Sequence, residues 1–280
     1  MEFTSTQGEQ RYAEVVKSAD SLVVGLDFDG TLSPIVDDPE AAHIHDEAPE
    51  LLVELARHVR AVAVVTGRPA RQVLDLGGLD EVGDAMGEDG RELHLFGQYG
   101  NERWSSHNRR VVSPRPPHGL ATFLRELPRV LRREGAEDAF VEMKGLAVAV
   151  HTRRLAEPEA AFDRLLPVLT ELARSHELKV EPGRNVIEVR SPGMHKGTAV
   201  ATLADEQKAG AFVFVGDDLG DVDAFEAVRK LRADGMATLL VCSGSEEENA
   251  LVDLSDVLVH GPDGVLEFLR QLMADIDAAR

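Results

Sequence analysis

The chain has 280 residues, 43% of them hydrophobic, which is enough to bury the core of one large domain or of a domain with a second module. Fifty acidic and thirty basic residues give a net charge of −20 at pH 7, which disfavours nucleic acid and anionic membranes as partners. The single cysteine, Cys242, excludes an intramolecular disulfide, and its apolar surroundings indicate an inert thiol. No apolar run approaches the roughly 20 residues of a membrane span, and the polar start has no signal-peptide pattern, so we expect a cytoplasmic protein.

The chain opens with a polar stretch that we expect to be a frayed tail leading into a short helix by residue 20. The apolar run Leu22–Leu26 then predicts a buried β-strand, and two carboxylates, Asp27 and Asp29, follow it directly. Gly30 lets the chain turn sharply after them, because it has no Cβ. In an open α/β sheet, ligands bind just beyond the carboxyl ends of the strands, so these carboxylates are placed for catalysis.

The spacing of the two carboxylates suits phosphoryl transfer. The oxygens of a phosphoryl group are anionic, so an attacking aspartate needs a divalent cation to offset the repulsion. Asp27 is the candidate nucleophile and a candidate metal ligand, while Asp29 is the candidate general acid and base. A calcium loop is disfavoured, since it needs glycine at its sixth position and Gly30 is the fourth residue here. An acidic turn without chemistry stays open as the alternative.

Two further apolar strands are expected at 61–65 and 93–96. The first ends at Thr66, which can cap a following helix because a proline stands near the first turn of that helix. The second leads into the segment 97–104, where two glycines around polar and aromatic residues indicate a loop pressed close to a ligand. The aspartates at 37–38, in the loop after the first strand, are expected to be solvated.

A proline-rich segment at 113–117 marks a connection between modules. After a helix, the pattern becomes two strands around a Lys-Gly turn, an amphipathic helix at about 158–175 and two more strands. A β-β-α-β-β unit inserted between core strands is typical of a cap. We therefore expect a Rossmann-like α/β core with a parallel sheet at 1–112 and 188–280, and a smaller inserted α/β cap that determines substrate specificity at 113–187.

The last part of the core carries a lysine and an acidic cluster. Lys196 stands at the start of a predicted helix, where the positive end of the helix dipole disfavours a cation unless an anion lies in front of it. Lys196 is therefore a candidate phosphate-binding residue. The apolar strand 211–215 runs into Asp217, Asp218 and Asp221, and such a density of carboxylates needs a cation or strong solvation. We expect Asp217 to bind a metal ion, and Asp218 and Asp221 to orient the ligands or the lysine.

The segment Asp27-Phe28-Asp29-Gly30-Thr31-Leu32 after an apolar strand resembles the first signature of the haloacid dehalogenase superfamily. Thr66, Lys196 and the Asp217-Asp218 pair stand in the order and at the strand ends that the superfamily requires. This resemblance implies phosphoryl transfer through an aspartyl phosphate, with a hydroxyl group at Thr66 binding a phosphoryl oxygen. It also implies Mg²⁺, held by Asp27, the main-chain carbonyl of Asp29 and Asp217.

Within the superfamily, the chain resembles the trehalose-6-phosphate phosphatase family over nearly its whole length. Four segments carry this resemblance: 66–69, 97–102, 142–145 with His151 and Arg153, and 187–197. It implies a Mg²⁺-dependent hydrolase of trehalose biosynthesis that acts on a small-molecule sugar phosphate in a core closing against a cap. The substrate contacts that it implies are Gly67, Arg68, Tyr99, Gly100, Glu102, Glu142, Lys144, Glu188 and Arg190.

The chain departs from the family pattern at three positions, and alternatives stay open. Tyr99 stands where many relatives have His, Met143 where an acidic or amide residue is common, and Gly220 where Thr is frequent. These departures weaken the assignment of the sugar more than the assignment of the reaction, because the candidate nucleophile, general acid, lysine and metal-binding carboxylates are all present. One alternative is a phosphatase for sucrose phosphate or mannosyl phosphoglycerate. Another is a catalytically silent binding module, which the presence of both Asp27 and Asp29 disfavours. The oligomeric state is open, with a monomer as the simplest expectation.

Overall fold

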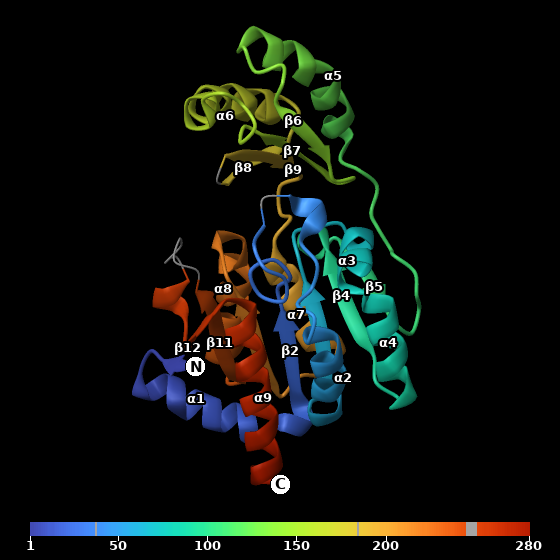
Figure 1. Ribbon diagram of the computed structural model, residues 1–280, viewed down its shortest axis with the longest axis vertical. Coiled ribbons are helices and arrows are strands. Elements are labelled where there is room, and N and C mark those ends of the chain that lie inside the picture. Colours follow the sequence, from blue (N-terminus) through green and yellow to red (C-terminus); the bar gives the residue numbers. More distant parts are fainter. Residues whose placement is uncertain (37, 184, 245–250) are drawn as a thin grey trace. The chain divides into compact units, whose positions relative to one another are not determined.

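The computed structural model describes residues 1–36, 38–183, 185–244 and 251–280. The chain divides into two compact units, which we describe separately: unit 1 comprises Met1–Ser113 and His195–Arg280, and unit 2 comprises Pro114–Met194 (Figure 1). Among the described residues, no helix combines the length and the apolarity needed to cross a membrane.

Unit 1 is built on one eight-stranded sheet with the order β1-β12-β11-β10-β2-β3-β4-β5. The strands from β12 to β4 run parallel, and β1 and β5 pair antiparallel at the two edges. The strands are β1 (Glu2–Phe3), β2 (Leu22–Leu26), β3 (Ala61–Val65), β4 (Leu93–Gly97), β5 (Glu102–Ser105), β10 (Ala211–Gly216), β11 (Ala237–Gly244) and β12 (Val257–His260).

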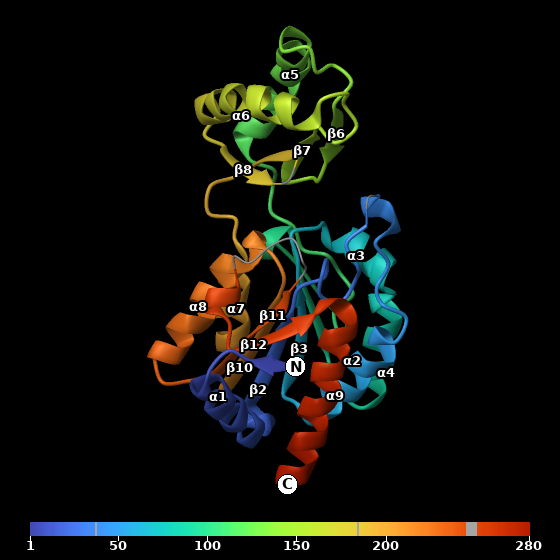
Figure 2. The ribbon, with the colours of Figure 1, turned by 60° about the vertical axis from the view of Figure 1, so that its left-hand side comes forward.

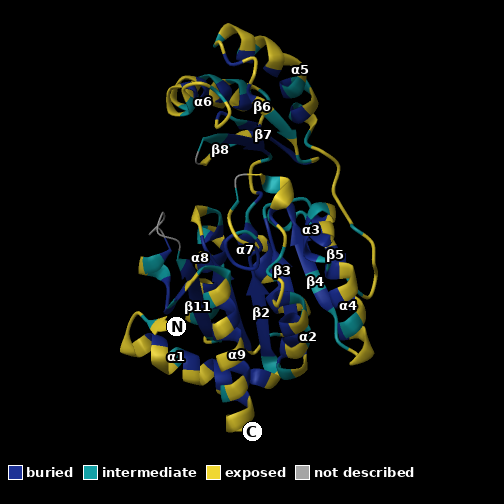
Figure 3. Cartoon of the chain, viewed as in Figure 1, coloured by how far each residue is buried: buried dark blue, intermediate teal, exposed yellow. Residues whose placement is uncertain are grey.

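Helices cover both faces of this sheet, as a parallel sheet requires. One apolar cluster joins the sheet to α1, α2, α3, α4 and α9, and a second joins the opposite face to α7 and α8. Figure 2 shows the strands between these two helical layers, and Figure 3 shows that the central strands are buried. The helices are α1 (Thr6–Lys17), α2 (Ala48–His58), α3 (Ala70–Gly77), α4 (Leu79–Glu88), α7 (Lys196–Glu206), α8 (Val222–Ala233) and α9 (Gly261–Ala279).

The alternation of side chains along each strand explains the two layers. In β2, Val24 and Leu26 belong to the first apolar cluster, while Val23 points to the α7 and α8 side. Because both faces are apolar, every residue of β2 and β3 is buried, and their sequences are continuous apolar runs. Polar side chains can therefore enter the interior only where the strands end, which places the site at the carboxyl ends of β2, β3 and β10.

Unit 2 is a four-stranded antiparallel sheet with two helices packed on one face. The sheet order is β6-β7-β9-β8, and α5 and α6 share an apolar cluster with Val148, Val150, Ile187 and Val189. The other face of the sheet carries the polar residues of the same strands. The elements are α5 (His118–Arg133), β6 (Phe140–Met143), β7 (Ala147–His151), α6 (Pro158–Ser175), β8 (Lys179–Gly183) and β9 (Val186–Arg190).

The predicted α/β class with a parallel sheet is confirmed, and so is the amphipathic helix at 158–175. The frayed N-terminal tail is wrong, because β1 pairs with β12 and Thr4 hydrogen-bonds to the main chain of Ser255 and Asp256. The loop expected at 97–104 is also wrong in its second half, since β5 pairs with β4. Asp38 is exposed and accepts a hydrogen bond from Glu40 N, while Asp37 lies outside the described residues.

The first boundary between the two units lies close to the expected one, and the second lies further along the chain than expected. The first boundary falls after Ser113, one residue beyond the expected core segment, but the second falls after Met194 rather than at 187. The reason is that β9, which carries Glu188 and Arg190, pairs with β7 and β8 in the sheet of unit 2. Both residues therefore belong to unit 2.

Candidate active site

A buried lysine joins two carboxylates at the end of the central strands. Asp27 follows β2, Asp221 lies at the start of α8, and Lys196 is the first residue of α7. Lys196 Nζ lies 2.6 Å from Asp27 Oδ1 and donates to Asp221 Oδ1 at 2.7 Å. Burial alone would lower the pKa of Lys196, but the two carboxylates outweigh it and raise that pKa well above its usual value. Lys196 is thus a fixed cation beside Asp27.

Asp217 completes a cluster of three buried carboxylates. Single oxygens of Asp27, Asp217 and Asp221 lie within 4.8 Å of one another. Asp221 Oδ2 accepts a hydrogen bond from the main-chain N–H of Asp217 at 3.0 Å, so Asp221 orients both Lys196 and the end of β10. Asp218, beside them, is exposed and accepts from Gly220 N.

The carboxylates of this cluster outnumber the cation that lies between them. Burial, followed by repulsion from Asp218 and Asp27, raises the pKa of Asp217 to about 10. Burial and repulsion from Asp221 likewise raise the pKa of Asp27 well above its usual value. A divalent cation held by oxygen ligands would relieve both effects, and carboxylates are the ligands that Mg²⁺ prefers. The residues present therefore fit a Mg²⁺ site at Asp27 and Asp217.

Asp29 and Arg68 form a two-pronged ion pair. Arg68 Nε donates to Asp29 Oδ2 and Nη2 donates to Asp29 Oδ1, each at 2.7 Å. Arg68 Nη1 also donates to Pro39 O, in the loop that follows β2. The turn containing Asp29 and the turn that follows β3 are thus joined by side chains.

The loop after β3 is held by the loop after β4. Thr66 is fully buried, and its Oγ1 accepts from Arg68 N at 3.0 Å, so it stabilises its own turn and does not cap α3. Tyr99 N donates to Thr66 O, and the Tyr99 ring fills the space that a Cβ at Gly67 would need. Tyr99 and Gly100 have φ of +57° and +93°, a left-handed backbone that costs energy for tyrosine and brings Gly100 against α7.

Glu102, one of the predicted substrate residues, binds the start of a helix in the structure. Its Oε2 accepts from the main-chain N–H of Ala70, the first residue of α3, at 2.7 Å. That N–H has no acceptor within the helix, and a carboxylate at a helix N-terminus also interacts favourably with the helix dipole. Glu102 therefore fixes the start of α3 and the end of the loop 66–69.

The remaining predicted substrate residues lie on the polar face of the sheet in unit 2. The register places Ala149 between Glu142 and Glu188, and Glu181 next to Glu188 on the far side. Three carboxylates therefore stand in one row across the sheet.

A basic side chain lies against each of these carboxylates. Lys144 Nζ lies 2.8 Å from Glu188 Oε2, and His151 Nε2 lies 2.9 Å from Glu142 Oε2. Arg190 reaches Glu188 Oε1 at 3.5 Å and Glu181 Oε1 at 3.4 Å. Lys144, Glu188 and Arg190 are thus joined by ion pairs, and Glu142 stands in the same row of the sheet. These groups can donate to and accept from the hydroxyl groups of a sugar.

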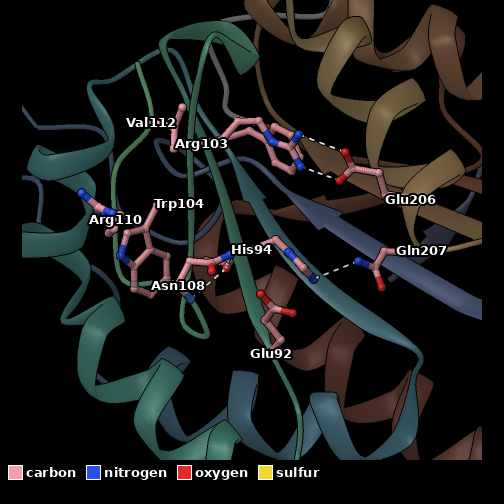
Figure 4. Close-up of a pocket in the computed structure, with 11 residues that line it drawn as sticks. Glu92, His94, Arg103, Trp104, Asn108, Arg110, Val112, Glu206 and Gln207 are labelled. Atoms are coloured by element: carbon pink, nitrogen blue, oxygen red, sulfur yellow. Dashed lines mark hydrogen bonds and ion pairs between the residues drawn. The ribbon is translucent and has the colours of Figure 1, made fainter. Parts of the chain in front are cut away.

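A hollow of about 600 Å³ lies elsewhere on unit 1, at the sheet edge formed by β4 and β5 (Figure 4). The Arg103 guanidinium lies over the Phe96 ring and pairs with Glu206, and His94 contacts Gln207. Burial lowers the pKa of His94. None of the predicted catalytic residues lines this hollow, so it is not where they would react.

One buried polar residue near the cluster was missed by the sequence analysis. Ser243, near the end of β11, donates from Oγ to Gly30 O at 2.6 Å. The available signal was a serine directly after the apolar run 239–242, at a strand end like those of Asp27 and Thr66. Cys242 beside it is fully buried, and burial raises the pKa of its thiol to about 11, in agreement with an inert thiol.

A sequence model of the trehalose-phosphatase family matches residues 25–257, which include every element of the site described above. The chain belongs to the trehalose-phosphatase family. This family assignment agrees with the resemblance seen in the sequence, and it covers both units.

Relatives of this trehalose-phosphatase family member include plant enzymes. A trehalose 6-phosphate phosphatase of Zea mays is 31% identical over 272 residues, covering 90% of this chain and 69% of the relative. Trehalose-phosphate phosphatase B of Arabidopsis thaliana is 29% identical over 277 residues, covering 94% and 69%. An uncharacterised glycosyl hydrolase of Mycobacterium tuberculosis is 34% identical over 267 residues, or 91% of this chain, and the chain spans only 18% of that relative.

Solved structures share the fold. The C-terminal domain of C. albicans trehalose-6-phosphate phosphatase has a TM-score of 0.75 at 19% identity, with 98% of each chain covered. A haloacid dehalogenase-like hydrolase from Bacteroides thetaiotaomicron has a TM-score of 0.62 at 16% identity, covering 90% of this chain and 99% of that one. At these identities the likeness concerns the fold of this trehalose-phosphatase family member and not its chemistry.

Proposed function

We propose that the chain hydrolyses trehalose 6-phosphate to trehalose and phosphate, through an aspartyl phosphate on Asp27. The observation that carries the proposal is the buried contact between Lys196 and Asp27, 2.6 Å apart, at the end of the central strand of a trehalose-phosphatase fold. A buried nucleophile held beside a fixed cation, and surrounded by carboxylates that suit a metal, is the arrangement that phosphoryl transfer needs.

In the first step, an oxygen of Asp27 attacks the phosphorus atom and the bond from phosphorus to the sugar oxygen breaks. Asp29, in its protonated form, gives its proton to the departing sugar oxygen. Lys196, held by Asp221, places its charge beside the attacking carboxylate, and Thr66 and Arg68 at the end of β3 supply donors for the phosphoryl oxygens.

In the second step, Asp29 takes a proton from a water molecule, and the water oxygen attacks the phosphorus atom of the aspartyl phosphate. The bond between phosphorus and the Asp27 oxygen breaks, which releases phosphate and restores the carboxylate. Asp29 regains its proton for the next cycle. The same residue therefore acts as acid and then as base.

A Mg²⁺ ion bound by Asp27, Asp217 and the main-chain carbonyl of Asp29 would neutralise negative charge on the phosphoryl group. Asp221 holds the main chain at Asp217 and also holds Lys196, which suits an orienting role for Asp221. Asp218 is exposed, so its influence on such an ion would act at longer range.

In this proposal, residues of unit 2 determine which sugar is bound. Glu142, Lys144, Glu188 and Arg190 offer carboxylate, ammonium and guanidinium groups on one face of the sheet. We assign these four residues to the sugar hydroxyls. Glu102, whose carboxylate is bound to α3, is assigned instead to positioning the loop 66–69.

The proposal is tested by measuring phosphate release across a panel of sugar phosphates with Mg²⁺ present. Trehalose 6-phosphate should give the highest kcat/KM, and Asp27→Asn should abolish turnover while the matched control Asp80→Asn, at an exposed aspartate of α4, should not. A higher kcat/KM for sucrose phosphate or mannosyl phosphoglycerate would change the proposed substrate and leave the proposed mechanism unchanged. Turnover that survives in Asp27→Asn would overturn the aspartyl phosphate, and no release from any substrate would identify a silent binding module.

A further inference from the structure

The hydrogen bond from Ser243 crosses the end of β10. In the sheet, β10 lies between β11 and β2, and the register pairs Gly216 with Cys242, so Asp217 and Ser243 continue their strands side by side. Gly30 lies in the turn after β2, on the other side of β10. The bond from Ser243 Oγ to Gly30 O therefore links the two strands that flank Asp217.

Gly30 is in direct contact with Asp217. A Cβ placed on residue 30 would lie 2.0 Å from Asp217 Oδ2, so this carboxylate packs against the glycine backbone. Gly30 also has a φ of +70°, and its N–H donates to Ser33 O at 2.7 Å. With the N–H held by Ser33 and the C=O held by Ser243, both peptide groups of Gly30 have fixed directions.

The peptide group before Gly30 contains the main-chain carbonyl of Asp29. Its direction depends on the backbone of Gly30, which without a Cβ has a wide choice of conformations. A hydrogen bond at Gly30 O restricts that choice. Ser243 is only 1% exposed, so water does not compete for this bond.

We propose that Ser243 is a positioning residue for the metal site: through Gly30 it fixes the Asp217 carboxylate and the Asp29 carbonyl in the geometry that binds Mg²⁺. This inference rests on the proposed function, because it takes the metal at Asp27 and Asp217 from there. Ser243 itself contacts neither the substrate nor the ion. Groups that orient metal ligands typically contribute about 10- to 100-fold to metal affinity, and Ser243 acts through the backbone, so the lower end applies.

The test is a titration of the metal-free full chain with MgCl₂ by calorimetry, which measures binding without turnover. Ser243→Ala should raise the Kd for Mg²⁺ by about tenfold. Ser255→Ala is the matched control, because Ser255 is also buried and donates from Oγ to a main-chain carbonyl, Leu251 O, at the same 2.6 Å. Ser255→Ala should lower the Tm and leave the Kd for Mg²⁺ unchanged.

Two further measurements separate positioning from folding. Ser243→Thr keeps the hydroxyl donor and should restore the Kd to within about threefold of the wild type, and phosphate release by Ser243→Ala should recover when MgCl₂ is raised. If Ser243→Ala fails to fold, Ser243→Cys, which keeps the shape with a weaker donor, should show the same direction of change.

The outcomes distinguish the two proposals. A wild-type chain that releases phosphate and binds Mg²⁺, with Ser243→Ala binding equally well, overturns the positioning role and leaves the proposed function intact. An equal rise in the Kd for Mg²⁺ in Ser243→Ala and Ser255→Ala assigns Ser243 to stability alone and also overturns the positioning role. A wild-type chain that binds no Mg²⁺ removes the metal from the proposed function, and the role of Ser243 falls with it.

Discussion

Both oxygens of the Asp29 carboxylate accept hydrogen bonds from one guanidinium, that of Arg68, at 2.7 Å each. A carboxyl group that carries a proton on one oxygen cannot keep both of these bonds at full strength. The acid step proposed for Asp29 therefore requires Arg68 to release one oxygen. An anionic phosphoryl group is a suitable competitor for Arg68, because guanidinium binds phosphate oxygens as readily as carboxylate oxygens.

Replacing Arg68 should affect both binding and the acid step. In Arg68→Gln, Asp29 loses two charge-assisted donors and the phosphoryl group loses a cation, so we expect kcat/KM to fall roughly 10- to 100-fold. Arg71→Gln removes the same charge from an exposed residue of α3 and is the matched control. Steady-state kinetics on the two variants make the comparison. Equal kcat/KM values for both would show that the ion pair with Asp29 has no part in the reaction.

Metal removal should stop the reaction reversibly. The crowding of Asp27, Asp217 and Asp221 leaves a deficit of positive charge that Lys196 alone does not cover. Activity should therefore disappear with a chelator and return with Mg²⁺, and Asp217→Asn should weaken Mg²⁺ binding more than Asp218→Asn, whose side chain is exposed. Phosphate release after dialysis against the chelator measures this. Full activity in the chelated enzyme would exclude the metal.

The same crowding predicts how the metal-free protein responds to pH. The pKa of Asp217 in the fold is raised from 3.8 to about 10 by burial and by the neighbouring carboxylates. Because the folded value lies above the unfolded one, the stabilising contribution is complete below pH 3.8 and is lost as the pH rises to about 10. Near neutral pH, the metal-free fold therefore keeps this carboxyl group protonated, and this costs free energy because the unfolded chain carries the group ionised.

Asp217→Asn should consequently stabilise the metal-free protein. The amide has a similar shape and no charge, so we expect the Tm in chelator at pH 8 to rise by about 2 to 4 °C for each kcal/mol of unfolding free energy that is recovered. The Tm of the variant should also fall less between pH 5 and pH 8 than the Tm of the wild type. Added Mg²⁺ should raise the Tm of the wild type and not that of the variant. A lower Tm for Asp217→Asn in chelator would contradict this account.

The sequence predicts site residues best where a buried apolar strand ends abruptly in a polar residue. Asp27, Thr66 and Asp217 each follow a continuous apolar run, and a buried parallel strand that ends in a polar group predicts a site with few alternatives. β1 and β5 were missed for the opposite reason. They are short strands at the sheet edges, so their sequences show neither a long apolar run nor a clear alternation, and only pairing with β12 and β4 defines them.

Side-chain partners were harder to predict than strand ends. Nothing in the sequence indicates that Arg68 pairs with Asp29, or that Ser243 reaches Gly30, because these contacts join segments 39 and 213 residues apart. Glu102 shows the same limit. The family resemblance implied a sugar contact for Glu102, and nothing in the sequence indicated that its carboxylate accepts from the main-chain N–H of Ala70, 32 residues away.

Glu102 should therefore behave as a capping residue. Glu102→Ala removes the acceptor for Ala70 N, so the free energy of unfolding should fall by about 0.5 to 2 kcal/mol, as for other N-terminal capping groups. Because the loop 66–69 loosens, kcat/KM should fall by a similar factor for trehalose 6-phosphate and for p-nitrophenyl phosphate. Glu102→Gln keeps an acceptor oxygen and is the control. A loss confined to trehalose 6-phosphate would return Glu102 to the sugar contacts.

The opposite pattern is expected for Glu142 and Glu188. They stand on either side of Ala149, and each has a basic partner of its own, His151 and Lys144 respectively. If Glu142 and Glu188 accept from the sugar hydroxyls as proposed, truncating either carboxylate leaves a hydroxyl and the basic partner without their acceptor.

Each of Glu142→Ala and Glu188→Ala should cost about 1 to 3 kcal/mol of transition-state stabilisation with trehalose 6-phosphate, or roughly 5- to 150-fold in kcat/KM. The small ester p-nitrophenyl phosphate has no sugar hydroxyls, so its kcat/KM should stay within about twofold of the wild type. Glu159→Ala, at an exposed glutamate in the first turn of α6, is a matched control that should spare both substrates. The deciding measurement is the ratio of kcat/KM for the two substrates. The roles proposed for Asp27, Lys196 and Asp217 concern the phosphoryl group, which both substrates share. A parallel fall for both substrates would therefore mean that Glu142 and Glu188 support the fold or the reaction site, and the sugar-binding role proposed for unit 2 would have to be withdrawn.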